Sequence, residues 1–169
     1  MMRLRRGQRG TAGAEFAILL PIMLLLVVGL VDLARMIYAQ QLLSDLSRET
    51  ANLVSRGTTP ADAIDSVVRT SEVFDVDSDG FVVISTIRRT DAGNDNPWIF
   101  SQAGSGALTE FLSRVGANNG PASLPGIDSL PVGVTLMAVE IVQDFEPIFE
   151  IKGLGMDFYP DTLYQAAYF

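Results

Sequence analysis

The chain is organised around one stretch, Gly10-Thr-Ala-Gly-Ala-Glu15-Phe16-Ala-Ile-Leu-Leu-Pro-Ile-Met-Leu-Leu-Leu-Val-Val-Gly-Leu-Val31. Residues 16–31 carry no charge, and Glu15 is the one charged residue of the whole stretch. As a helix that rises about 1.5 Å per residue, these roughly 22 residues match a hydrocarbon layer about 30 Å thick. The sequence therefore predicts a transmembrane helix with a carboxylate at its entrance.

The charges on the two sides of this stretch predict its orientation. Four arginines precede it, namely Arg3, Arg5, Arg6 and Arg9. On the far side Asp32 and Arg35 cancel. Because basic residues are retained in the cytoplasm, we expect the N-terminus inside and the rest of the chain outside. A cleaved secretory signal fits less well, since residues 29–35 offer no small-x-small pair and the apolar run exceeds an ordinary signal core.

Length and composition set limits on function. With 169 residues, the chain can hold one anchor and one modest domain. After Gly10 it carries eight basic and 20 acidic residues, a net charge of −12, which argues against binding nucleic acid or anionic headgroups. Cysteine and histidine are absent, which excludes disulfides, Ser-His-Asp sites and conventional zinc sites. The sequence predicts neither an enzyme nor a cofactor.

The helix is predicted to continue beyond the membrane, because residues 32–56 contain neither glycine nor proline. Mostly apolar residues recur there at spacings of three and four: Met36, Ala39, Leu43, Leu46, Thr50 and Leu53. This stripe favours packing against the protein's own domain over a dimeric coiled coil. Gly57 is expected to end the helix.

The remaining chain is predicted to form a small α+β domain with an antiparallel sheet. Thr59 can cap a second helix that begins at Pro60. Runs rich in β-branched and aromatic residues predict strands at 81–87, 98–101, 132–142 and 145–151. The last two of these are expected to pair as a hairpin.

Other segments have less specific patterns. Residues 108–115 are spaced for a short amphipathic helix, and residues 117–131 are typical of a long surface loop. Trp98 is expected to anchor the core. The aromatic tail, residues 158–169, either closes the core or docks against another subunit.

One acidic motif suggests a metal site. Asp75, Asp77 and Asp79, followed by Gly80, match the start of an EF-hand calcium loop. The twelfth position is Thr86, which cannot supply the bidentate carboxylate of such a loop. A solvated acidic turn is therefore favoured, with weak calcium binding as the alternative.

The N-terminal motifs resemble those of prepilins. A basic leader that ends in Gly10, a glutamate five positions later and an apolar helix from Phe16 form the class III signal of type IV pilins and pseudopilins. With Tyr38-Ala-Gln-Gln further on, the run is similar to TadE/TadF proteins of the tight-adherence (Tad or Flp) pilus system. The resemblance covers about the first third of the chain.

The resemblance implies a pilin-like fold, in which a long helix, half of it transmembrane, packs on the small sheet domain. Its parts would be a leader at 1–10, an anchor at 11–31, an extracytoplasmic extension at 32–57 and a globular domain at 58–169. A prepilin peptidase would cut between Gly10 and Thr11, and Glu15 would act in assembly.

The implied function is that of a minor pilin or pseudopilin in Tad pilus assembly. Its partners would be the prepilin peptidase, other pilins or pseudopilins, an inner-membrane assembly platform and the lipid bilayer. The protein would reside in the inner membrane with its domain in the periplasm, or be incorporated in the pilus. The alternative is an uncleaved, anchored envelope module that binds a ligand or scaffolds a complex, in which Glu15 would have no role.

Overall fold

The structure is a computed structural model that describes residues 8–70, 76–90, 97–107, 113–148 and 159–169. The chain divides into two compact units, and the division falls inside the first helix. One unit comprises Met1–Tyr38 and Glu146–Tyr159, and the other comprises Ala39–Phe145 and Pro160–Phe169.

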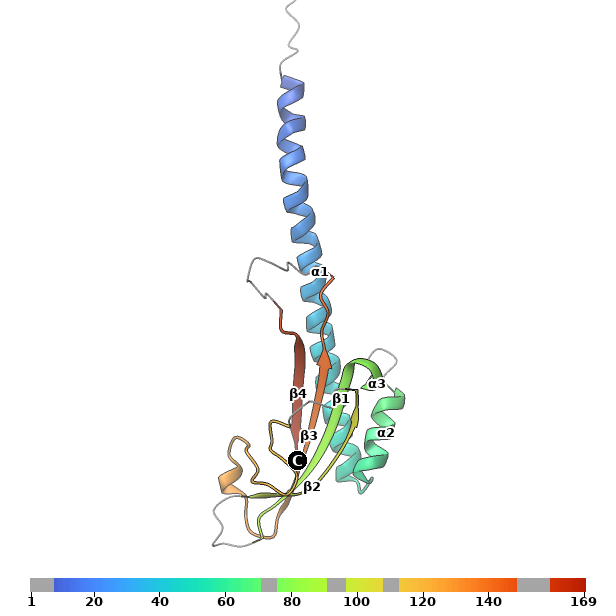
Figure 1. Ribbon diagram of the computed structural model, residues 1–169, viewed down its shortest axis with the longest axis vertical. Coiled ribbons are helices and arrows are strands. Elements are labelled where there is room, and N and C mark those ends of the chain that lie inside the picture. The colour runs from blue at the N-terminus through green and yellow to red at the C-terminus, as the bar shows by residue number, and fades with distance from the viewer. Residues whose placement is uncertain (1–7, 71–75, 91–96, 108–112, 149–158) are drawn as a thin grey trace, which may run out of the picture. The chain divides into compact units, whose positions relative to one another are not determined.

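The helix α1 runs from Gln8 to Ser55 and contains 48 residues (Figure 1). As predicted, Gly57 terminates this helix just after its last residue, and its φ of +96° lies in the left-handed region. The N–H of Gly57 donates to the carbonyl of Val54 over 3.0 Å. The N–H of Thr58 donates to the carbonyl of Leu53 over 3.2 Å. Together these bonds form a Schellman motif, which satisfies carbonyls that a helix end would otherwise leave unpaired.

The next helix, α2 (Pro60–Thr70), also begins where the sequence predicts. The backbone N–H of Asp62 donates to Oγ1 of Thr59 over 3.2 Å, so Thr59 is the N-cap. A single helical turn, α3 (Val76–Asp79), then leads directly into the sheet.

The sheet has four antiparallel strands in the order β2-β1-β3-β4. The strands are β1 (Gly80–Arg88), β2 (Trp98–Gly106), β3 (Thr135–Asp144) and β4 (Thr162–Tyr168). This confirms the predicted α+β class, with a long N-terminal helix and a small antiparallel sheet. The β1 prediction is nearly correct in its bounds, and β2 extends further than predicted.

The prediction of a hairpin between β3 and residues 145–151 is wrong in its described part. Residues 145–148 are not in a strand, and β4, from the aromatic tail, pairs with β3 instead. Pro147 has no N–H to donate to a strand ladder, so this segment is a poor partner for β3. β3 also begins at Thr135 rather than at residue 132, because a turn with φ of +83° at Gly133 precedes it.

The role predicted for Trp98 is also wrong. The Trp98 side chain is 43% exposed, whereas Ile99 is fully buried. Successive residues of a strand point to opposite faces, and Ile99 takes the inward position opposite Ile87. Of the short helix predicted at 108–115, residues 108–112 lie outside the described residues, and residues 113–115 are not helical.

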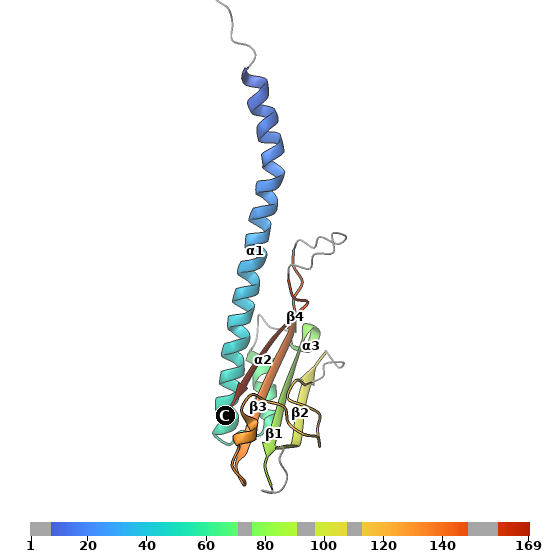
Figure 2. The same cartoon turned by 90° about the vertical axis from the view of Figure 1, so that its left-hand side faces the viewer.

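One face of the sheet packs against helices. Its buried residues include Val82 and Ile84 of β1, opposite Ile141 and Val139 of β3. The helix α2 and the part of α1 from Ala39 onward lie on this side (Figure 2). They contribute the buried side chains Leu43, Leu46, Ala51, Val54, Ala63, Ile64 and Val67. Part of the predicted α1 stripe is therefore buried within its own domain.

The other face is covered by the segment between β2 and β3. Ile87, Ile99 and Ala138 of the sheet form a buried cluster with Val115 and Ile127 of this segment. The predicted surface loop at 117–131 thus contributes Ile127 to a second core. The strand β1 is buried on both faces, which explains why it is apolar at successive positions.

A carboxylate lies in the middle of the sheet. Glu140 of β3 is fully buried. Its Oε1 accepts hydrogen bonds from the N–H of Arg114 and the hydroxyl of Tyr164, each over 2.8 Å. Its Oε2 accepts from the hydroxyl of Ser113. A buried carboxylate is tolerated when donors surround it, so Glu140 ties the covering segment and β4 to the central strand.

Substitution of Gly106 by alanine should be strongly destabilising. Gly106 has a φ of +139°, and a Cβ there would collide with the backbone at Gly80 and Phe81 of the paired strand. Gly57→Ala is the matched control, because its φ is also positive but no atom lies within 4 Å of the added Cβ. Denaturant unfolding should show a loss of about 1 kcal/mol for Gly57→Ala and a clearly larger loss for Gly106→Ala. Equal losses would contradict the close strand approach.

The protein should lose stability above about pH 10. Burial, followed by the hydrogen bond and the charge of Glu140, raises the pKa of Tyr164 far above its ordinary value of about 10. The folded state then keeps a proton that the unfolded chain has released, so this contribution is complete below pH 10 and falls as the pH rises. Burial and Glu140 also raise the pKa of Tyr168.

The test compares wild type with Tyr164→Phe by thermal melting at pH 8 and at about pH 11. At pH 8 the variant should be less stable by about 1–3 kcal/mol, because Glu140 loses a donor. Between pH 8 and about pH 11, the variant should lose less stability than wild type does. Tyr168 titrates in both proteins, so the variant should still lose some stability. An identical loss in the two proteins would show that Tyr164 does not carry the effect.

Candidate functional site

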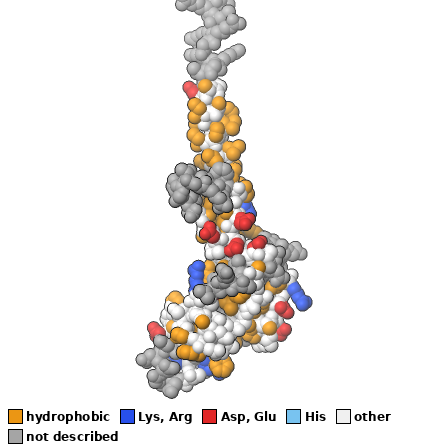
Figure 3. Space-filling view, in the orientation of Figure 1, with side chains coloured by type: hydrophobic (Ala, Val, Ile, Leu, Met, Phe, Trp, Pro, Cys, Tyr) orange, Lys and Arg blue, Asp and Glu red, His pale blue; other side chains and the backbone are white. Residues whose placement is uncertain are grey.

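The first half of α1 exposes apolar side chains all around the helix. Ile18, Leu19 and Leu20, which as successive helical residues point about 100° apart, are 69%, 54% and 46% exposed. Figure 3 shows hydrophobic side chains along this part of the helix. Only 6% of the most apolar 18-residue stretch of this helix is buried inside the protein, whereas the core helix of a soluble protein would be mostly buried. By length and composition, α1 can cross a membrane.

The residues predicted to be cut and to act in assembly lie near the start of this helix. Gly10 and Thr11 lie within α1, which begins at Gln8. Glu15 follows on the same helix and is exposed. Positions 11 and 15 are separated by four residues, so a helix places them on one face, one turn apart. The geometry therefore brings the predicted new N-terminus close to Glu15.

Polar contacts join α1 to another part of the chain where the apolar run ends. Asp32 is fully buried, and its Oδ1 accepts from the N–H of Ile148 over 2.9 Å. Arg35 forms an ion pair with the same oxygen over 3.2 Å, and its Nη1 also approaches the carbonyl of Glu146 at 3.5 Å. The hydroxyl of Tyr159 donates to the carbonyl of Gly29 over 2.9 Å. We call these four contacts the helix-exit cluster.

Sequence reasoning missed most of this cluster. It noted only that the charges of Asp32 and Arg35 cancel, and it assigned residues 145–151 to the sheet. The signal that could have corrected it is Pro147, which disfavours a strand. No local pattern connects Tyr159 with Gly29, because 130 residues separate them.

The acidic motif has only a partial description. Asp75 lies outside the described residues, as does the side chain of Asp77, and Asp79 is exposed at the end of α3. Within the described ranges, no group of three or more acidic, histidine or cysteine residues is placed to hold a metal ion. The preference for a solvated turn over calcium binding stays a prediction.

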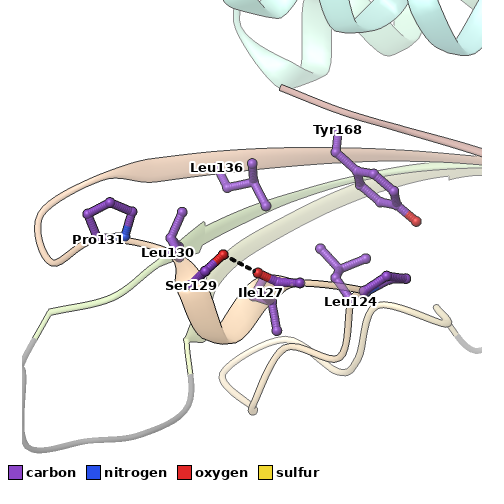
Figure 4. A pocket seen from close by; sticks show the side chains of 9 residues that line it. Leu124, Ile127, Ser129, Leu130, Pro131, Leu136 and Tyr168 are labelled. Carbon is purple, nitrogen blue, oxygen red and sulfur yellow. Dashed lines mark hydrogen bonds between the residues drawn. The ribbon is translucent and has the colours of Figure 1, made fainter.

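An apolar groove of about 290 Å³ lies where the segment before β3 faces the strands (Figure 4). Its lining includes Leu124, Ile127, Leu130, Pro131, Leu136 and Tyr168. Tyr168 is 47% exposed there, whereas Leu163 at the other end of β4 is buried. The aromatic tail thus supplies an edge strand to the core and one wall of this groove. The lining provides apolar contacts and two hydroxyl groups, from Ser129 and Tyr168, with no carboxylate among these residues.

One part of the chain is similar to a known protein family. Residues 10–52 match the family model described as TadE-like protein. The chain has no match among the curated proteins or among the solved structures. The matched segment begins at the glycine before the predicted cut and includes the whole apolar run. Over residues 10–52, which form most of α1, the chain is therefore similar to TadE-like proteins.

Proposed function

We propose that this protein is a minor pilin or pseudopilin that supports the initiation or assembly of a Tad (Flp) pilus. One observation carries the proposal: the TadE-like match at residues 10–52 coincides with a helix whose apolar side chains are exposed. A helix with this surface needs lipid or other apolar helices around it. A membrane-anchored pilus component has both, first in the bilayer and then among neighbouring anchors.

The anchor is inserted with its N-terminus in the cytoplasm and its sheet domain in the periplasm. This orientation is supported by the arginine cluster before residue 10 and by the mutual neutralisation of Asp32 and Arg35 after the apolar run. The bilayer is therefore the first partner. The other partners are the prepilin peptidase, further pilins or pseudopilins and an inner-membrane assembly platform.

Processing takes place between Gly10 and Thr11. Gly10 is the one glycine that makes Glu15 the fifth residue of the mature chain, since Gly7 would make it the eighth and Gly13 the second. The cut frees an ammonium group on Thr11, one helical turn from Glu15. A carboxylate at the apolar end of a span is costly unless it is paired, and this ammonium, from the same or a neighbouring subunit, is a suitable partner.

The orientation can be tested with reporter fusions at residue 169 of the full-length chain. Alkaline phosphatase, which is active outside the cytoplasm, should be active at this position, whereas a cytoplasmic reporter should be inactive. The reason is the excess of arginines before the apolar run. The reverse pattern would mean that the domain lies in the cytoplasm, which would exclude the proposed role.

Processing can be tested by mass spectrometry of the N-terminus in cells that carry the pilus system. Wild type should begin at Thr11, and Gly10→Ala should keep its leader. Gly13→Ala is the matched control and should be cut normally, because a Cβ at residue 13 meets no atom within 4 Å. An intact leader in wild-type cells would exclude the pilin function and favour the uncleaved envelope module.

The role of Glu15 requires a separate variant. Glu15→Gln should give a cleaved protein that no longer supports piliation, because the ammonium on Thr11 loses its charged partner. Glu49→Gln is the control, since it removes an exposed carboxylate from the same helix outside the apolar run. Pili would be counted by electron microscopy. Normal piliation with Glu15→Gln would reduce Glu15 to a residue that merely lies at the membrane surface.

A further inference from the structure

We propose that the chain makes a second contact with the bilayer, at its outer boundary, through Ile148 and Tyr159. This inference rests on the proposed membrane insertion of α1. It starts from the helix-exit cluster, in which Glu146, Ile148 and Tyr159 all bond to α1 within residues 29–35. Ile148 and Tyr159, which are about ten residues apart in the sequence, are thus both bonded to the same two turns of α1.

The depth of this contact follows from the hydrogen bond of Tyr159. Its acceptor, the carbonyl of Gly29, belongs to the uncharged run, whereas Asp32 is the first charged residue after it. The two positions are about 4.5 Å apart along the helix axis. If residues 16–31 fill the hydrocarbon layer, the Tyr159 hydroxyl must lie at the boundary between acyl chains and headgroups. Tyrosine is enriched at this level because its ring is apolar and its hydroxyl is polar.

The polar groups of the cluster are compatible with such a position. A backbone N–H or a charge at the edge of the hydrocarbon layer is costly unless it has a partner. Asp32 accepts from both the N–H of Ile148 and the guanidinium of Arg35, and none of its side chain is exposed. The Arg35 side chain is 48% exposed and can extend its charge towards water.

Exposed apolar side chains lie beside this cluster, together with the exposed side chain of Glu146. The Ile148 side chain is 63% exposed, and its polar N–H is already bonded to Asp32. In the same unit, Ile37 and Tyr38 of α1 are 48% and 58% exposed. This surface continues directly from the exposed apolar run of α1, which argues for lipid as its occupant. Because Asp32 and Arg35 neutralise each other, the contact should not require anionic headgroups.

Tryptophan fluorescence in the full-length protein can measure this contact. Trp98 is the one tryptophan, so Trp98→Phe gives a silent background. Ile148→Trp is added to it, with Leu20→Trp and Leu33→Trp as depth standards at exposed positions of α1. Each protein is reconstituted in phosphatidylcholine vesicles whose acyl chains are brominated near the headgroup or near the bilayer centre.

Bromines near the headgroup should quench the indole at position 148 at least twofold more than bromines near the bilayer centre. The indole at position 33 should show the same preference. At position 20 the deep bromines should quench more. Addition of phosphatidylglycerol should not change the result. Tyr159→Phe should reduce the shallow quenching at position 148, because it removes the bond to Gly29. Tyr38→Phe, which removes an exposed hydroxyl of α1, is the control and should leave the quenching unchanged.

Three outcomes would overturn the proposal. Quenching at position 20 without quenching at position 148 would leave the anchor intact but exclude the second contact. Absence of quenching at both positions would exclude the anchor itself and, with it, the proposed function. Quenching at position 148 that is absent at high protein density and appears only when the protein is diluted in excess lipid would show that the partner of this surface is another copy of the chain.

Discussion

The cost of removing charge or unpaired backbone groups from water is the constraint on which this structure depends. Residues 16–31 satisfy it with an uncharged helix, whose hydrogen bonds are internal and whose side chains are exposed. The two charged groups nearest the ends of this run, Glu15 and Asp32, differ in their surroundings. Asp32 is fully buried and bonded to Ile148 and Arg35, whereas Glu15 is exposed. That contrast is consistent with a structural role for Asp32 and leaves Glu15 available to a partner.

The same rule governs the sheet domain. Glu140 is buried in the central strand, where an unpaired carboxylate would strongly destabilise the fold. Three donors, from Ser113, Arg114 and Tyr164, surround it. Because the chain lacks cysteine, no disulfide can hold the covering segment in place. The buried carboxylate and the apolar cluster around Ile127 perform that task instead. A polar group in the core thus connects segments that are distant in sequence.

Helix ends and local strand patterns were predictable because their causes are local. The cap at Thr59 and the stop at Gly57 depend on residues within one helical turn, and both are observed. The β1 prediction also holds, since its β-branched run is buried on both faces. The errors concern pairing. Residues 145–151 are apolar enough to be a strand, but β4 pairs with β3 in their place. Trp98 is expected to anchor the core, whereas strand alternation places Ile99 there.

The sequence by itself determined a helix able to span a membrane and the similarity of residues 10–52 to TadE-like proteins, because hydrophobic length and motif spacing act along the chain. Tertiary structure alone decided the strand order, the burial of Glu140 and the helix-exit cluster. Each of these joins residues far apart in sequence, such as Gly29 and Tyr159. Such contacts depend on which surfaces are buried together, and a local pattern states only that a surface is apolar, not what covers it.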